Sequence, residues 1–136
     1  MPRLEFFVVS EDVSVDQATN LTSVFSILEE VKAPAFPLLI FRCAATSLWC
    51  REPGDEGRDF QVVLRITTPG DEPREFPTNF RLDHARHRTV QRLQGLPIQR
   101  AGELRFEVLL NGEHKASHVV TVEQAVPLDV IAETAH

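Results

Sequence analysis

Apolar and polar side chains alternate with a period of two in several stretches of the chain, which is the pattern of a half-buried β-strand. The clearest stretch runs from Arg58 to Thr68, and one side of it carries Phe60, Val62, Leu64 and Ile66. A turn-forming Pro-Gly-Asp-Glu-Pro cluster follows, and the alternation then resumes at Phe76, Thr78, Phe80 and Leu82. Pro77 cannot donate a ladder hydrogen bond, so we expect this second stretch at a sheet edge or with a bulge.

A third alternating stretch, 103–110, ends in Asn111-Gly112, the strongest short hairpin signal in the chain. A two-residue loop there would place polar Glu113 and Lys115 opposite apolar residues. A loop of odd length, with Gly112 in the left-handed conformation, instead gives the next strand an inward face made of His114, Ala116, His118, Val120 and Val122. We therefore predict the odd loop and a partly buried His118.

The remaining segments are read from composition and spacing. Leu4–Val9 is expected to be a strand, and Phe36–Cys50 one long strand or two consecutive ones, apolar on both faces because both faces are covered. Leu21–Val31 fits helical spacing but is rich in residues that favour strands; strand is preferred and helix stays open. Arg86–Leu93 is expected to be a strand, and Pro127–His136 a frayed end or one helical turn.

Seven to nine strands separated by turn clusters, with at most one short helix, predict an all-β antiparallel β-sandwich. Immunoglobulin-like topology is the first choice and a jelly roll the alternative. We expect one sandwich domain over residues 1–123 and a C-terminal tail over 124–136.

The chain has 136 residues, enough to bury roughly 68% of its extended surface as one domain. It shows no secretory signal, and its longest apolar stretch is shorter than the roughly 20 residues that span a bilayer. Cys43 and Cys50 are seven residues apart, so on one strand they face opposite sides and cannot pair. Free thiols in such a chain lead us to expect the cytoplasm.

A net charge of −6 opposes binding to nucleic acid or to an anionic membrane. The segment Arg81–Arg105 nevertheless holds six arginines against Asp83 and Glu103, a local charge of +4. Within it, three arginines share strand parity and therefore one face: Arg86, Arg88 and Arg92. They are our candidate binding residues for an acidic partner, a phosphate or another copy; the alternative is an exposed face with ion pairs to its neighbours.

Candidate metal ligands are few. His114 and His118 lie about 13 Å apart along a strand, too far to share an ion. Asp83, His84 and His87 are closer and form a weak candidate set, against the simpler reading of a polar turn. The acidic loop Glu52–Asp59 lacks the alternation of carboxylates typical of calcium sites, so we predict no cofactor.

Catalytic signatures are missing from the sequence. No nucleophile motif or phosphate loop is present, and Cys50, beside Trp49, lies in an apolar strand where burial makes a thiol inert. Glu52 and Asp59 resemble a glycosidase carboxylate pair only as any two acidic residues do. Trp49 itself is expected in the core.

Three segments together resemble a known family: FFVVSEDVSVDQATNLTSVFSILEEV, LWCREPGDEG and RLQGLPIQRAGELRFEVLLNGE. The family consists of short bacterial proteins classed as a domain of unknown function, and the resemblance extends from about Leu4 to Glu123. It implies a sandwich and a bacterial cytoplasmic origin, and it brings no catalytic residues.

These observations favour a non-enzymatic module that binds another protein or a second copy of itself, through an exposed strand edge or the Arg81–Arg105 surface. The alternatives are a small-ligand or metal-dependent enzyme that uses Glu52–Asp59 with His84 and His87, and a structural subunit of a larger assembly.

Overall fold

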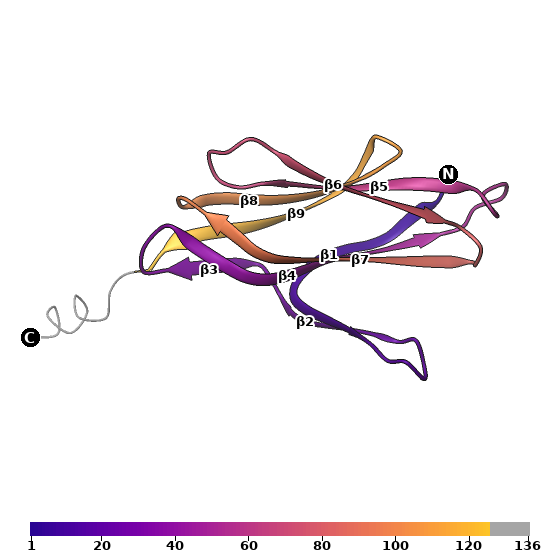
Figure 1. Cartoon of the computed structure of the whole chain (residues 1–136), viewed down its shortest axis with the longest axis horizontal. Coiled ribbons are helices and arrows are strands. Elements are labelled where there is room, and N and C mark those ends of the chain that lie inside the picture. The colour runs from indigo at the N-terminus through magenta and orange to yellow at the C-terminus, as the bar shows by residue number, and fades with distance from the viewer. Residues whose placement is uncertain (126–136) are drawn as a thin grey trace, which may run out of the picture.

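A computed structural model describes residues 1–125, which form an all-β sandwich of two sheets (Figure 1). Sheet A is ordered β2 (Thr22–Ile27), β1 (Arg3–Val15), β4 (Leu38–Cys50) and β7 (Arg86–Ile98). Sheet B is ordered β3 (Glu30–Ala33), β9 (Glu113–Gln124), β8 (Gly102–Leu110), β5 (Asp59–Thr67) and β6 (Arg74–Arg81). The predicted sandwich is confirmed, with nine strands in the described part.

The sheets are not purely antiparallel, which corrects one part of the prediction. β3 pairs parallel with β9, from Glu30 opposite Thr121 to Ala33 opposite Gln124. The reason is that the chain leaves sheet A after β2 and continues directly along the edge of sheet B. The immunoglobulin-like connectivity stays a prediction, which the strand order β9-β8-β5-β6 beside β1-β4-β7 favours over a jelly roll.

The segment Leu21–Val31 is extended, as preferred, and no helix occurs in residues 1–125. It forms two strands rather than one, because it crosses between the sheets at Leu28 and Glu29. No element of the described chain is a helix long and apolar enough to cross a membrane.

The core between the sheets is built from the inward side of each alternating strand. Its larger cluster includes Val9, Cys43, Leu64, Ile66, Ile98, Leu104, Phe106 and Val120. A second cluster surrounds the fully buried Trp49 and contains Phe60, Val62, Phe80, Leu82, Val108 and Leu110. Trp49 is thus a core residue, and the alternation over Arg58–Thr68 is confirmed as β5.

β6 forms an edge of sheet B, as Pro77 predicts. Pro77 lies opposite Val63 of β5. The Gln91 side chain of β7 donates hydrogen bonds to the Phe76 carbonyl (3.0 Å) and the Thr78 hydroxyl (3.4 Å), so it links the two sheets on this side.

The β8–β9 hairpin corrects the predicted odd loop. Leu110 lies opposite Glu113, so the loop is the two-residue Asn111-Gly112 turn, with φ of 47° and 84° as a type I′ turn requires. The register shifts one step later, because Lys115 is an extra residue between the partners of Leu109 and Val108.

This bulge restores the apolar face beyond the turn. His118 lies opposite Phe106 and Val120 opposite Leu104, as predicted, whereas His114 pairs with Leu109 and is exposed instead of facing inward. The apolar pattern correctly predicts one extra residue in this hairpin. The prediction of its place is wrong, because the extra residue is Lys115 in the strand and not a third loop residue.

His118 is partly buried, as expected, and it bridges the two sheets where the chain crosses between them. Its Nδ1 accepts from the Val9 N–H (3.4 Å), and its Nε2 bonds the Leu28 carbonyl. The Leu28 N–H in turn donates to the Val9 carbonyl (2.9 Å). One imidazole therefore joins β9, β1 and the β2–β3 crossing.

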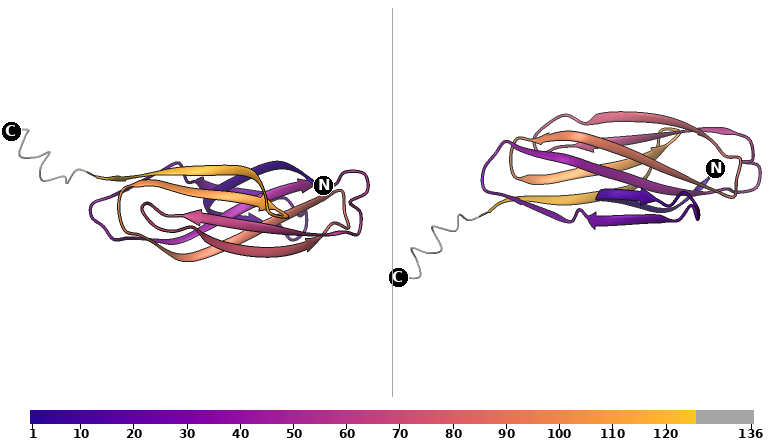
Figure 2. Two further views of the ribbon diagram at one scale, coloured as in Figure 1. Left: turned by 90° about the horizontal axis from the view of Figure 1, so that it is seen from above. Right: turned by 60° about the horizontal axis from the view of Figure 1, so that its bottom comes forward.

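The long strands of both sheets run along the length of the molecule (Figure 2). The N-terminus lies at one end, and the last described residues of β9 lie at the other (Figures 1 and 2). The tail expected at 124–136 lies, beyond residue 125, outside the described residues.

We expect His118→Ala to lower the free energy of unfolding by about 1–3 kcal/mol, because the buried Val9 N–H loses its acceptor. Urea unfolding measures this, and His114→Ala is the matched control on the same strand. That exposed histidine should change stability by about 0.5 kcal/mol or less. Equal effects of the two substitutions would contradict the bridging role.

Candidate functional site: a groove on the outer face of sheet A

The outward side of β4 is apolar, like its inward side. In register across sheet A, Leu48 lies between Phe6 of β1 and Arg88 of β7, and Cys50 lies opposite Arg86. Ala44 pairs with Arg92. The three arginines of the predicted stripe therefore share this outer face, and their role in binding stays a prediction.

The β1–β2 hairpin covers part of this face. β2 lies beyond β4 on the side away from sheet B (Figure 1). Arg88 donates to the backbone oxygen (3.3 Å) and the side-chain oxygen (2.9 Å) of Asn20, and Arg92 donates to the Val13 carbonyl (2.9 Å). Ala44 and Thr46 are consequently buried although they point outward. Two arginines of the stripe thus hold the hairpin in place.

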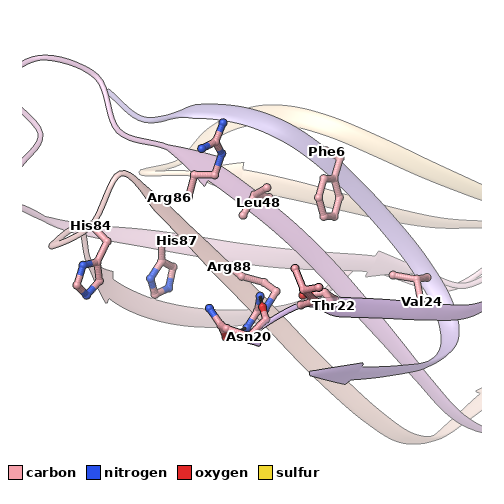
Figure 3. A pocket seen from close by; sticks show the side chains of 10 residues that line it. Phe6, Asn20, Thr22, Val24, Leu48, His84, Arg86, His87 and Arg88 are labelled. Carbon is pink, nitrogen blue, oxygen red and sulfur yellow. Dashed lines mark hydrogen bonds between the residues drawn. The ribbon is translucent and has the colours of Figure 1, made fainter. Parts of the chain in front are cut away.

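A groove of about 610 Å³ remains where the hairpin stops short (Figure 3). Sheet A contributes the apolar residues Phe6 and Leu48 to its lining. One wall comes from the hairpin: Asn20, Leu21, Thr22 and Val24. The other comes from the start of β7 and the loop before it: His84, Arg86, His87 and Arg88. The lining contains no acidic residue, in a chain whose net charge is −6.

Arg86 is already paired. Its guanidinium donates to both carboxylate oxygens of Glu5 (3.2 and 3.3 Å), and the Cys50 thiol donates to the same carboxylate (2.7 Å). The thiol and Arg86 hydrogen bonds lower the pKa of Glu5. The Glu5 hydrogen bond, burial and the Glu5 charge raise the pKa of Cys50. This thiol is therefore a hydrogen-bond donor and a poor nucleophile.

Arg88 differs from Arg86, because among the described residues it contacts only the neutral oxygens of Asn20 and no carboxylate. Its charge acts on the neighbouring His87, whose ring stacks on Phe80 at 4.4 Å between centroids. Burial, the charge of Arg88 and the charge of His84 all lower the pKa of His87. The groove thus holds positive charge that its own lining does not neutralise.

The free edge of β2 borders the groove. The Asp16 N–H donates to the Leu21 carbonyl (2.9 Å), and strict alternation from that pair turns the backbone groups of Thr22 and Val24 away from β1. Val13, the partner of Val24, follows the same alternation, because its carbonyl points away from β2 and accepts a hydrogen bond from Arg92. Thr22 and Val24 therefore present unpaired N–H and C=O groups along the groove.

The structure does not bring the weak metal candidates Asp83, His84 and His87 together into one cluster. No group of three His, Cys, Asp or Glu side chains able to hold an ion occurs within residues 1–125. Asp83 pairs with Arg81 (2.9 Å), while His87 turns toward Phe80. His84 alone of this set remains on the exposed rim of the groove (Figure 3).

The acidic loop is held by the contacts of Asp55. Asp55 is buried, accepts from the Glu52 N–H (2.9 Å) and pairs with the N-terminal ammonium (3.0 Å). Burial raises the pKa of Asp55, but these two partners and the charge of Arg58 outweigh that effect, so the net shift is downward. Asp59 belongs to β5, opposite Arg81. Both cysteines are free, with Cys43 in the core and Cys50 on the outer face, as predicted.

The hydrophobic pattern predicts only half of the groove. It does not single out Phe6 and Leu48, or the hairpin residues Asn20, Thr22 and Val24. The run Thr22–Ile27 contains neither the charges nor the proline that usually protect an edge strand, so no local signal marks it as one. The contact of Arg88 with Asn20 joins residues 68 positions apart, which periodicity does not reveal.

A comparison with known families matches residues 5–123 to a family described as a family of unknown function, DUF6941. No curated protein matches the chain.

We expect Cys43 and Cys50 to be alkylated by iodoacetamide at least about tenfold more slowly in the folded protein than in urea. Glu5→Gln should accelerate the reaction of Cys50, because the carboxylate that raises its pKa is gone, and leave Cys43 unchanged. The pKa of Cys43 is raised to about 11 by burial alone. Mass spectrometry of quenched samples measures both rates, and an unchanged Cys50 rate would contradict the assignment.

The lowered pKa of His87 makes stability depend on pH. The unfolded histidine, with its ordinary value near 6.5, takes up a proton that the folded residue resists. The contribution of neutral His87 to the free energy of unfolding is therefore complete above pH 6.5, and it is lost as the pH falls toward the pKa of the folded residue. An NMR titration should give a midpoint below 6.5, and His87→Gln should flatten the loss of stability in that range. A midpoint at or above 6.5 would contradict the lowered pKa of His87.

Proposed function

The chain belongs to the DUF6941 family, and because that family has no assigned function, we propose from the geometry that this protein is a non-enzymatic protein-binding module. A partner contributes an extended segment that pairs with the free edge of β2 and lies in the groove. The observation that carries the proposal is an uncharged, exposed edge strand beside an apolar and cationic groove.

The edge of β2 lacks the protection that edge strands usually have. Such strands are commonly shielded by charged residues, proline or a very short length. β6 carries Pro77, and β3 has four residues. β2 has the sequence Thr-Ser-Val-Phe-Ser-Ile, with positive φ at Ser26 as its only interruption. A regular stretch therefore remains open for strand addition over residues 21–25.

Exposed apolar side chains are concentrated on the same side of the sandwich. Of the eight exposed large hydrophobic residues in the described chain, six lie on β1, β4 or the β1–β2 hairpin: Phe6, Leu21, Phe25, Ile27, Leu39 and Phe41. The outer face of sheet B contributes only Val119 among them. An apolar surface of this kind is typical of a protein interface.

The cationic wall indicates the chemistry of the segment. Arg88 and His84 face the groove without an acidic neighbour in its lining, so an Asp or Glu side chain of the partner would supply the missing negative charge. The two free thiols support the cytoplasm as the compartment of this interaction.

The test is a selection from a random twelve-residue peptide library on the full chain, followed by affinity measurements on the best peptide. Val24→Pro removes the outward N–H without removing a β1–β2 ladder bond, and should weaken binding at least about tenfold. Val24→Thr keeps the N–H at similar volume and should change affinity by less than about twofold. Replacing the acidic residue of the peptide by its amide should also weaken binding.

Thermal unfolding of both variants separates lost binding from lost folding. The proposal is wrong if selection yields no peptide, or if Val24→Pro binds as tightly as Val24→Thr.

A further inference from the structure

Among the residues that the structure describes, Phe41 is the most exposed large apolar side chain, at 79%. It lies in the first half of β4, which pairs with β7 there but with β1 only from Ala44 onward. Leu38 and Ile40 pack against the core, and so does Cys43, so the inward side of β4 changes parity between residues 40 and 43. The change leaves Phe41 and Arg42 both exposed, and in the register of β4 with β7 the position opposite Phe41 is Gly95, which has no side chain.

A hollow of about 490 Å³ has Phe41 itself among its lining residues. Its apolar lining includes Leu28, Val31, Leu38 and Ile40, which are partly buried. A protruding phenyl ring thus stands at the margin of an apolar hollow on the same surface. These residues are separate from the groove between β2 and β7.

The charged residues around the hollow are also complementary between two copies of the chain. Glu11 and Arg42 both line it, and Glu11 has no basic partner within the described residues. Arg42 makes only a long contact with Asp12, 3.8 Å between Nη2 and Oδ2. A two-fold axis through this surface places Glu11 of one copy against Arg42 of the other, twice.

We propose that this surface is the interface of a two-fold homodimer, in which Phe41 of each copy fills the hollow of the other. The occupant is a second copy, because one surface carries both the Phe41 ring and the hollow, and both Glu11 and Arg42. That is the arrangement an isologous contact requires. The inference does not depend on the proposed binding of a partner segment to β2.

Analytical ultracentrifugation of the full chain over a range of concentrations tests the dimer. Phe41→Ser should raise the dimer dissociation constant at least about tenfold. It should fold normally, since the ring is largely in solvent. Val119→Ser, at the exposed apolar residue on sheet B, is the matched control and should leave association unchanged.

A charge exchange tests the two-fold arrangement. Glu11→Arg alone and Arg42→Glu alone each place like charges together in their own homodimer, and both should associate more weakly. An equal mixture of the two variants restores both opposite pairs in the heterodimer and should associate more tightly than either variant alone.

A wild-type chain that stays monomeric at every concentration overturns the proposal. So does a Phe41→Ser variant that dimerises like Val119→Ser. A mixture of charge variants no tighter than its components overturns the two-fold pairing.

Discussion

Strand β4 is apolar on both faces, and covering its second face determines the rest of the architecture. Sheet B covers the inward side, where Cys43, Ala45 and Trp49 join the core. The outward side carries Ala44, Thr46, Leu48 and Cys50. Exposing such a row to water is unfavourable, so a third layer is needed on this side. The chain supplies this layer with the end of β1, which extends past its last pair with β4, and with β2, which pairs with that end. The groove is the part of the face that this hairpin does not reach.

Arginines make this cover possible. A guanidinium has five donors and retains its charge, so it can satisfy backbone oxygens at a distance from its own strand. Arg92 and Arg88 do so for Val13 and Asn20, whereas Arg86 forms an ion pair with Glu5. Three residues that share one face by spacing therefore have three different electrostatic surroundings, and only Arg88 combines a place in the groove with the absence of a carboxylate contact in the described chain.

The local pattern predicted the sandwich, because the buried side of a strand is visible as an alternation of residues that are close together in sequence. Pro77 placed β6 at an edge, and the apolar face of β9 placed His118 inward, both from residues close in sequence. The position of the extra residue in the β8–β9 hairpin was missed, because a loop and a bulge shift the register equally. The type I′ turn favoured by Asn-Gly decides between them. The groove was only half predicted, since its walls meet through contacts between distant residues.

The placement of the two ends has a mechanical consequence. Residue 1 and the end of β9 lie at opposite ends of the molecule, and β1 and β9 belong to different sheets (Figure 2). A pulling force applied between them acts along both strands, parallel to their length. The hydrogen bonds of β1 with β4, and of β9 with β8 and β3, then carry the load together in shear instead of opening one after another. His118, which ties β9 to β1, lies across the path of that force.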